Sequence, residues 1–115
     1  MALDLPKLRR LVAIDPGDPL SRFALGKKLF EAHADDPSPA GAAALAEAAE
    51  HLTFANGRAP EHLATYHILV QVLIRLGRTD EARPVLEAGV RRVADVGEGM
   101  GRDLGPAMRQ LLDGL

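Results

Sequence analysis

The 115-residue sequence predicts an all-α fold of about five to six helices, and three observations support this prediction. Residues 66–94 contain two runs of apolar residues at helical spacing, separated by Gly77. Only 3% of the residues are aromatic while alanine is abundant, which favours closely packed helices over sheets. No stretch alternates β-branched and polar residues with a period of two, so we expect no strands.

The first predicted helix covers residues 3–14, with Pro6 in its first turn. Its apolar side is formed by Leu5, Leu8, Leu11, Val12 and Ile14. The sequence Asp15-Pro16-Gly17 should end this helix. Asp18 can then act as the N-cap of a second helix that begins at Pro19 and reaches about His33.

A polar connection at 35–39 separates the second helix from the third. Ser38 and Pro39 suit the N-cap and the first position of the third helix, which we expect from Ala40 to about Ala55. This helix is rich in alanine, so its neighbours can approach closely. Asn56 and Gly57 should end it.

The fourth predicted helix starts at Pro60 and Glu61 and is apolar almost all round. Its polar exceptions, His67, Gln71 and Arg75, are four residues apart and therefore form one line on the helix surface. A helix of this kind is packed on most sides and meets water along one stripe.

The fifth predicted helix follows Gly77, with Thr79 as its N-cap, and buries one stripe. Pro84 lies about five positions after this cap, so either the helix starts later or its first turn is distorted. The glycine-rich segment 96–105 is predicted to be a loop or a frayed turn. A final short helix at about 106–112 should lay Met108, Leu111 and Leu112 on the open end of the fold.

Residues 66–94 resemble the tetratricopeptide repeat (TPR), whose pattern is W-x2-L-G-x2-Y, A-x3-F and P over two helices. The pattern positions hold Tyr66, Leu69, Val70, Leu73, Ala82 and Leu86, and Ala94 stands at the final proline position. The turn 77–82, GRTDEA, is similar to the G-x-x-x-E-A turn of that family. In the preceding hairpin Leu25-Gly26 and Leu29 fit the pattern, but Arg22 stands at the tryptophan position.

The resemblance covers residues 15–94 and implies TPR-like antiparallel hairpins stacked as a short right-handed solenoid. It implies one domain at 1–115, with an N-terminal helix at 3–14 and a capping helix at 105–113. The first repeat is expected at 18–56, with an insertion at 35–39 that breaks the strict period. The second repeat is expected at 60–95. Two repeats are fewer than the three or so that solenoids usually need for stability.

In this family the first helix of each hairpin lines a concave groove that takes extended peptides or partner helices. The resemblance therefore implies a non-enzymatic protein–protein interaction module with groove candidates on two helices. These are Phe23, Lys27, Phe30, Glu31, His67, Gln71, Ile74 and Arg75. The family's carboxylate clamp is not carried over, since Phe23, Ala24 and Ile68 occupy its positions. Lys27 and Arg75 could still attract an acidic peptide.

Composition argues against several classes of chemistry. The sequence has no cysteine, a net charge of −2 and no apolar run of roughly 18 residues, so we expect a soluble cytoplasmic protein without a membrane span. We expect no cofactor and no metal. His62 and His67 are poorly spaced for a metal, and Glu47 and His51, four apart, should form a surface hydrogen bond instead. The glycines at 97–101 follow no strand and precede no P-loop lysine.

Two further functions stay open at this point. A nucleic-acid-associated accessory protein could use its basic clusters, Lys7, Arg9, Arg10, Arg91 and Arg92. Interspersed acids and the lack of an aromatic platform argue against it. A self-associating scaffold is the other alternative, because a short repeat stack has open ends; we expect a monomer or a weak homodimer.

Overall fold

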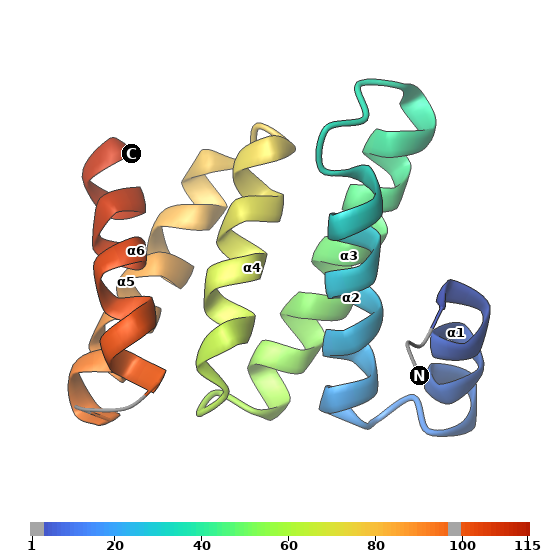
Figure 1. Ribbon diagram of the computed structural model, residues 1–115, viewed down its shortest axis with the longest axis horizontal. Helices are drawn as coiled ribbons and strands as arrows, with labels where there is room; N and C mark the ends of the chain where they lie inside the picture. The colour runs from blue at the N-terminus through green and yellow to red at the C-terminus, as the bar shows by residue number, and fades with distance from the viewer. Residues whose placement is uncertain (1–3, 97–99) are drawn as a thin grey trace.

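The computed structural model describes residues 4–96 and 100–115 (Figure 1). Within these ranges it contains helices and no strands, which confirms the all-α prediction. The six helices of the described part are α1 (Leu5–Ile14), α2 (Pro19–His33), α3 (Pro39–Arg58), α4 (Leu63–Arg75), α5 (Thr79–Val96) and α6 (Met100–Gly114).

The helices form two layers. Helices α2, α4 and α6 lie side by side in one layer, and α3 and α5 lie behind them (Figure 1). The pairs α2–α3 and α4–α5 are antiparallel hairpins, and α3 also packs on α4. Helix α1 packs on α2 at the N-terminal end, while α6 packs on α5 and α4 at the other. This arrangement is a short helical-repeat stack.

Side-chain caps start the first three helices where the sequence provides them. The Asp4 carboxylate accepts a hydrogen bond from the Lys7 N–H at 3.0 Å. Asp18 accepts from the Leu20 N–H at 3.1 Å, and the Ser38 hydroxyl accepts from the Gly41 N–H at 3.1 Å. Each cap precedes a proline in the first turn, where a missing N–H costs nothing. The predicted caps of α2 and α3 are confirmed, while α1 begins at Leu5 and the expected start at residue 3 lies outside the described residues.

The connection between α3 and α4 differs from the prediction. Helix α3 continues to Arg58, beyond the expected end near Ala55, and α4 begins only at Leu63. The Pro60 carbonyl accepts a hydrogen bond from the hydroxyl of buried Tyr66 at 2.6 Å. This bond holds residue 60 outside the helix, because a carbonyl inside α4 would instead accept a backbone N–H. The predicted start at Pro60 and Glu61 is therefore wrong.

The turn between α4 and α5 forms as predicted, but the cap does not. Gly77 has a φ of 75°, and the Arg78 N–H bonds the Leu73 carbonyl at 2.8 Å, a helix-ending pattern that favours glycine. The Arg78 carbonyl accepts the first N–H groups of α5, so Arg78 holds the cap position and Thr79 is already helical. The prediction that Thr79 caps α5 is therefore wrong.

Pro84 is accommodated inside α5, which runs unbroken from Thr79 to Val96. The helix therefore does not start later, one of the two possibilities left open. Because proline has no N–H, the Asp80 carbonyl lacks its usual helical donor. Asp80 and Pro84 are both exposed, so water can bond this carbonyl.

Helix α6 is longer than predicted. It begins at Met100, and α5 ends at Val96. The prediction of a loop at 96–105 is therefore wrong for Val96 and for residues 100–105. Residues 97–99 lie outside the described ranges. Glycine inside a helix costs about 1 kcal/mol per residue, which is why the sequence suggested a loop. The packing of α6 offsets this cost: Met108 is fully buried, and Leu111 and Leu112 pack against the core as expected.

The hydrophobic core is centred on α4 and joins both hairpins. Its largest fully buried apolar side chains come from five helices: Leu25, Leu29, Leu52, Leu69, Val70, Val72, Leu86 and Met108. Burying each such side chain contributes about 1.5–3 kcal/mol relative to exposure. Among the described residues, no helix is both long and apolar enough to cross a membrane.

Gly89 of α5 packs where a side chain would have no room, which leads to a stability prediction. A Cβ at Gly89 would overlap the Met108 methyl group and lie 2.9 Å from the Tyr66 Cβ. We expect Gly89→Ala to destabilise the fold by about 1–3 kcal/mol through overpacking, measured by urea unfolding. Gly57→Ala is the control, because its Cβ would meet nothing within 4 Å and should stabilise α3 by up to about 1 kcal/mol. Equal stability of the two variants would contradict the packing argument.

Candidate functional site

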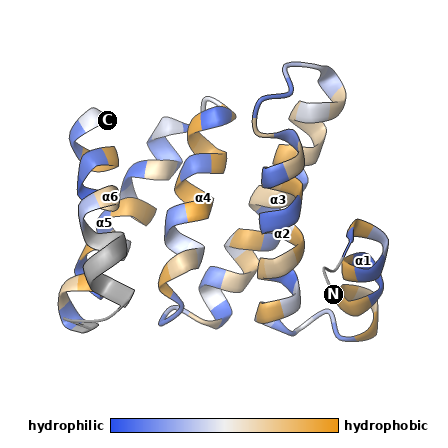
Figure 2. Cartoon of the chain, in the orientation of Figure 1, coloured by the Kyte–Doolittle hydropathy of each residue, from blue (hydrophilic) through white to orange (hydrophobic). Residues whose placement is uncertain are grey.

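The candidate groove lies on the layer formed by α2, α4 and α6. Along α4, hydrophilic bands interrupt hydrophobic ones (Figure 2). His67, Gln71 and Arg75 supply this polar line, and the Gln71 side-chain amide donates to the His67 carbonyl at 3.3 Å. His67 and Gln71 are half-buried, so partial burial lowers the pKa of His67. The polar line on α4 is therefore present, although Arg75 is the one member of the three that is exposed, with 42% of its side chain accessible to water.

Arg75 connects α4 to the end of α2. Its Nη1 donates to the Ala34 carbonyl at 2.9 Å and to the Asp35 carboxylate at 3.2 Å. Its guanidinium also lies 5.6 Å from the centre of the Phe30 ring, within cation–π range. Two groove candidates from different helices, Phe30 and Arg75, are thus brought together. Asp35 is 94% exposed, so the ion pair is a weak surface pair.

Two hollows meet at Arg75. One is lined by the α2–α3 connection and α3: Ala34, Asp35, Asp36, Pro37, Leu45 and Arg75. The other is lined by Gln71, Ile74, Arg75 and Leu111, from α4 and α6. Sequence reasoning placed Leu111 only at the end of the stack and gave the connection no role. No local pattern could have shown these contributions, because they depend on how distant segments pack.

The remaining groove candidates are more scattered. Phe23 packs edge-on against His62, with ring centres 4.7 Å apart, near the junction of α3 and α4. Lys27 and Glu31 are exposed on α2, and neither has a hydrogen bond or ion pair within the described residues. The structure therefore brings Phe30, Ile74, Gln71 and Arg75 into one region and leaves Phe23 apart from it.

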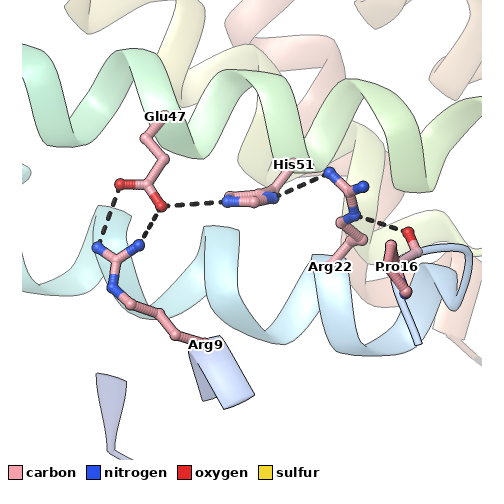
Figure 3. Close-up of polar contacts among 5 residues, drawn as sticks. All are labelled: Arg9, Pro16, Arg22, Glu47 and His51. Carbon is pink, nitrogen blue, oxygen red and sulfur yellow. Dashed lines mark hydrogen bonds and ion pairs between the residues drawn. The ribbon is translucent and has the colours of Figure 1, made fainter. Parts of the chain in front are cut away.

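A second polar cluster, here called the N-terminal polar chain, joins the first three helices (Figure 3). Arg9 of α1 makes a double hydrogen bond and ion pair with the Glu47 carboxylate of α3, which lowers the pKa of Glu47. Glu47 is also bonded to His51 Nε2 at 3.2 Å, so the expected Glu47–His51 bond is confirmed. Arg22 of α2 bonds His51 Nδ1 at 3.3 Å and donates from Nε to the Pro16 carbonyl at 2.9 Å.

The N-terminal polar chain explains why arginine stands where the resemblance expects tryptophan. The Arg22 guanidinium also lies 4.3 Å from the centre of the Phe54 ring. Arginine at this position combines a contact with an aromatic ring of α3 and hydrogen bonds to His51 of α3 and to the turn before α2. Sequence reasoning missed the roles of Arg9 and Arg22, because Glu47 is 38 residues from Arg9 and His51 is 29 residues from Arg22 in the sequence.

Within residues 4–96 and 100–115, no three His, Asp or Glu side chains come together as a metal site. The Glu47–His51 pair is completed by two arginines, and His62 bonds Thr65 at 2.8 Å. Arginine repels a metal cation, so the surroundings of His51 disfavour a metal, and the partners of His62 among the described residues are Thr65 and the ring of Phe23.

Comparison with known protein families adds a decisive observation to this geometry. The family model described as tetratricopeptide repeat matches residues 40–98, just over half of the chain. The chain belongs to the tetratricopeptide-repeat family. The match covers α3, α4 and α5, so it includes the second hairpin, on which the resemblance was strongest. TPR domains are in general protein–protein interaction modules. Comparisons with curated proteins and with solved structures give no match.

The lowered pKa of His67 predicts a pH dependence of stability. Burial disfavours its charged form, so the unfolded chain binds this proton more readily than the folded one. The contribution of neutral His67 to stability should therefore be fully present above about pH 6.5, the ordinary pKa of histidine in an unfolded chain. This contribution should be lost as the pH falls through the lower pKa of His67 in the folded state. In His67→Gln, the loss of stability between about pH 7.5 and pH 5 should be smaller than in the wild type. Urea unfolding at both pH values measures this, and equal losses would contradict it.

Proposed function

We propose that this TPR protein is a non-enzymatic interaction module that binds a peptide or helix of a partner protein across α2, α4 and α6. The proposed groove residues are Phe23, Lys27, Phe30, Glu31, His67, Gln71, Ile74 and Arg75, of which Phe23 lies beside His62, apart from the region around Arg75. The observation that supports this best is the position of Arg75, which lines both hollows of this layer. We further infer that the protein acts in the cytoplasm, in keeping with its lack of cysteine.

The chemistry around Arg75 favours a ligand with one apolar and one acidic side chain. Ile74 and Leu111 offer apolar surface beside Gln71 in one hollow. Arg75 can form a charge-assisted hydrogen bond with a carboxylate, and its present partner, Asp35, is an exposed side chain that a ligand can displace at low cost. Lys27 adds exposed positive charge on α2.

Charge reversal provides the main test of this groove. We expect Arg75→Glu to weaken binding of a partner peptide by about tenfold or more, because a charge-assisted hydrogen bond is replaced by repulsion. The peptide would first be obtained by crosslinking from the native source, and its affinity then measured by calorimetry. Arg92→Glu is the control, since it makes the same charge change at an exposed position on α5.

Chemical-shift mapping with the same peptide locates its contacts. Shifts concentrated on Lys27, Gln71, Ile74 and Arg75 are the expected result. Equal weakening by Arg75→Glu and Arg92→Glu, or contacts that avoid α2 and α4, would refute the groove.

Self-association is a second candidate function, favoured by a specific surface. The three large hydrophobic side chains that are most exposed in the described part all lie at the N-terminal end: Leu11 (39%), Ile14 (79%) and Leu20 (60%). Burying such a surface in a weak homodimer would remove apolar area from water. Light scattering over a concentration series tests this, and a constant monomer mass would remove the candidate.

The nucleic-acid alternative receives less support. Arg9 is occupied by Glu47 through a double hydrogen bond. Arg10, Arg91 and Arg92 are exposed, and no aromatic ring of the described residues lies against them. Early elution from heparin at moderate salt would count against this function.

A further inference from the structure

Helix α1 lies at the N-terminal edge of the stack and turns one fixed side outward (Figure 1). Its inner side is held in two ways: Leu8 is buried in the core, and Arg9 is bound to Glu47 of α3. Leu11 and Ile14, two of the most exposed large apolar side chains of the described part, lie on the outer side. Because both inner contacts fix the rotation of α1 about its axis, the same residues always face outward.

The outer side of α1 also carries a base and an acid. Arg10 precedes Ile14 by four residues and Leu11 precedes it by three, so these three side chains share one side of the helix. Asp15 follows as the exposed C-cap residue. Within the described residues, the side chains of Arg10 and Asp15 have no hydrogen bond or ion pair. Along the chain this surface is therefore basic, then apolar, then acidic.

This order is complementary to itself when two copies of α1 lie antiparallel about a two-fold axis. If Leu11 of one copy is level with Ile14 of the second copy, Arg10 is level with Asp15 of the second copy, because both pairs are centred on the same point of the helix. The two-fold axis then repeats each pair. A parallel arrangement would instead place Arg10 beside Arg10 and Asp15 beside Asp15, where like charges repel.

The electrostatics of α1 point to the same arrangement. Asp15 places a negative charge at the C-terminal end of the helix, and the last turn contains no basic residue. A negative charge is unfavourable there, because the C-terminal end of a helix already carries partial negative charge. In the antiparallel pair, Arg10 of the second copy would bring a positive charge to this end. A second copy thus supplies what α1 lacks in the single chain.

We propose that two copies of this chain associate through an antiparallel, two-fold contact between their α1 helices. Leu11 of each copy packs on Ile14 of the other, and Arg10 of each copy pairs with Asp15 of the other. This proposal rests on the self-association proposed above and specifies its surface and geometry. The apolar contact provides the favourable burial, while the exposed ion pairs mainly select the orientation.

The contact is small, so the dimer is weak and reversible. Four apolar side chains bury much less than the roughly 1,600 Å² of a standard stable interface. Helix α1 packs on α2 and has no contact with α4 or α6 within the described part. The pairing therefore leaves the polar line on α4 open in both copies.

Reversing one charge at a time tests the geometry in the whole chain. Arg10→Asp and Asp15→Arg should each raise the dissociation constant by about tenfold or more, because both ion pairs of the dimer become repulsive. Sedimentation velocity over a concentration series measures this. An equimolar mixture of the two variants should associate again, since one copy then presents two acids and the other presents two bases at the level positions.

Three controls separate this contact from unfolding and from general charge effects. Asp15→Arg places a cation at the C-terminal end of α1, where it favours the helix, so unfolding would not explain a loss of association. Ile14→Ser should also weaken association, although Ile14 is 79% exposed and contributes little to the core. Arg92→Asp makes the same charge change as Arg10→Asp at an exposed position on α5 and should leave association unchanged. Circular dichroism checks that each variant is folded.

The possible failures are distinguishable. A wild-type chain that stays monomeric at every concentration would remove self-association and this contact together. If the wild type associates but Arg10→Asp acts no more strongly than Arg92→Asp, or if the mixture of the two reversed variants stays monomeric, the α1 contact is refuted. Self-association would then have to use another surface.

Discussion

The stability of the fold depends above all on burying the apolar surface of α4 against its neighbouring helices. Seven of its thirteen residues are buried, including Leu69, Val70, Val72 and Leu73, so this helix cannot be stable with only one packed side. Helices α3, α5 and α6 supply the cover, and α2 touches it from the same layer. Because the polar line of His67, Gln71 and Arg75 is what remains open, the position of the candidate groove is a direct consequence of how α4 is buried.

The N-terminal part of the stack is held in a different way. Helix α1 buries one residue fully in its described range, Leu8, and α3 contributes mainly alanine, so apolar area is limited there. The polar chain of Arg9, Glu47, His51 and Arg22 links three helices in the place where the core is thinnest. Directional bonds of this kind fix a geometry but depend on protonation, whereas apolar contacts do not.

Sequence patterns predicted most of the fold because most of its determinants are local. The Asp18 and Ser38 caps and the Gly77 turn each depend on a few adjacent residues. Errors arose where side-chain contacts outside the periodic pattern decide: the hydroxyl of Tyr66 bonds the Pro60 carbonyl before α4, and burial of Met108 sustains α6 through its glycines. For the site, periodicity predicted the polar line on α4. Nothing local could predict the lining by Leu111 or the contacts of Arg22 with His51 and Phe54.

The two neighbouring acids of the connection between α2 and α3, Asp35 and Asp36, have different roles. Asp36 accepts a hydrogen bond from the Ser38 N–H at 3.0 Å and pairs with His33, and these contacts with Ser38 and His33 hold its pKa at about 2. It is therefore ionised throughout the physiological range and anchors the connection. Within the part of the chain that the structure describes, Asp35 has only Arg75 as its partner, and it is almost fully exposed. A connection anchored by Asp36 thus presents Asp35 beside the groove, where its negative charge disfavours acidic ligands unless they can replace it on Arg75.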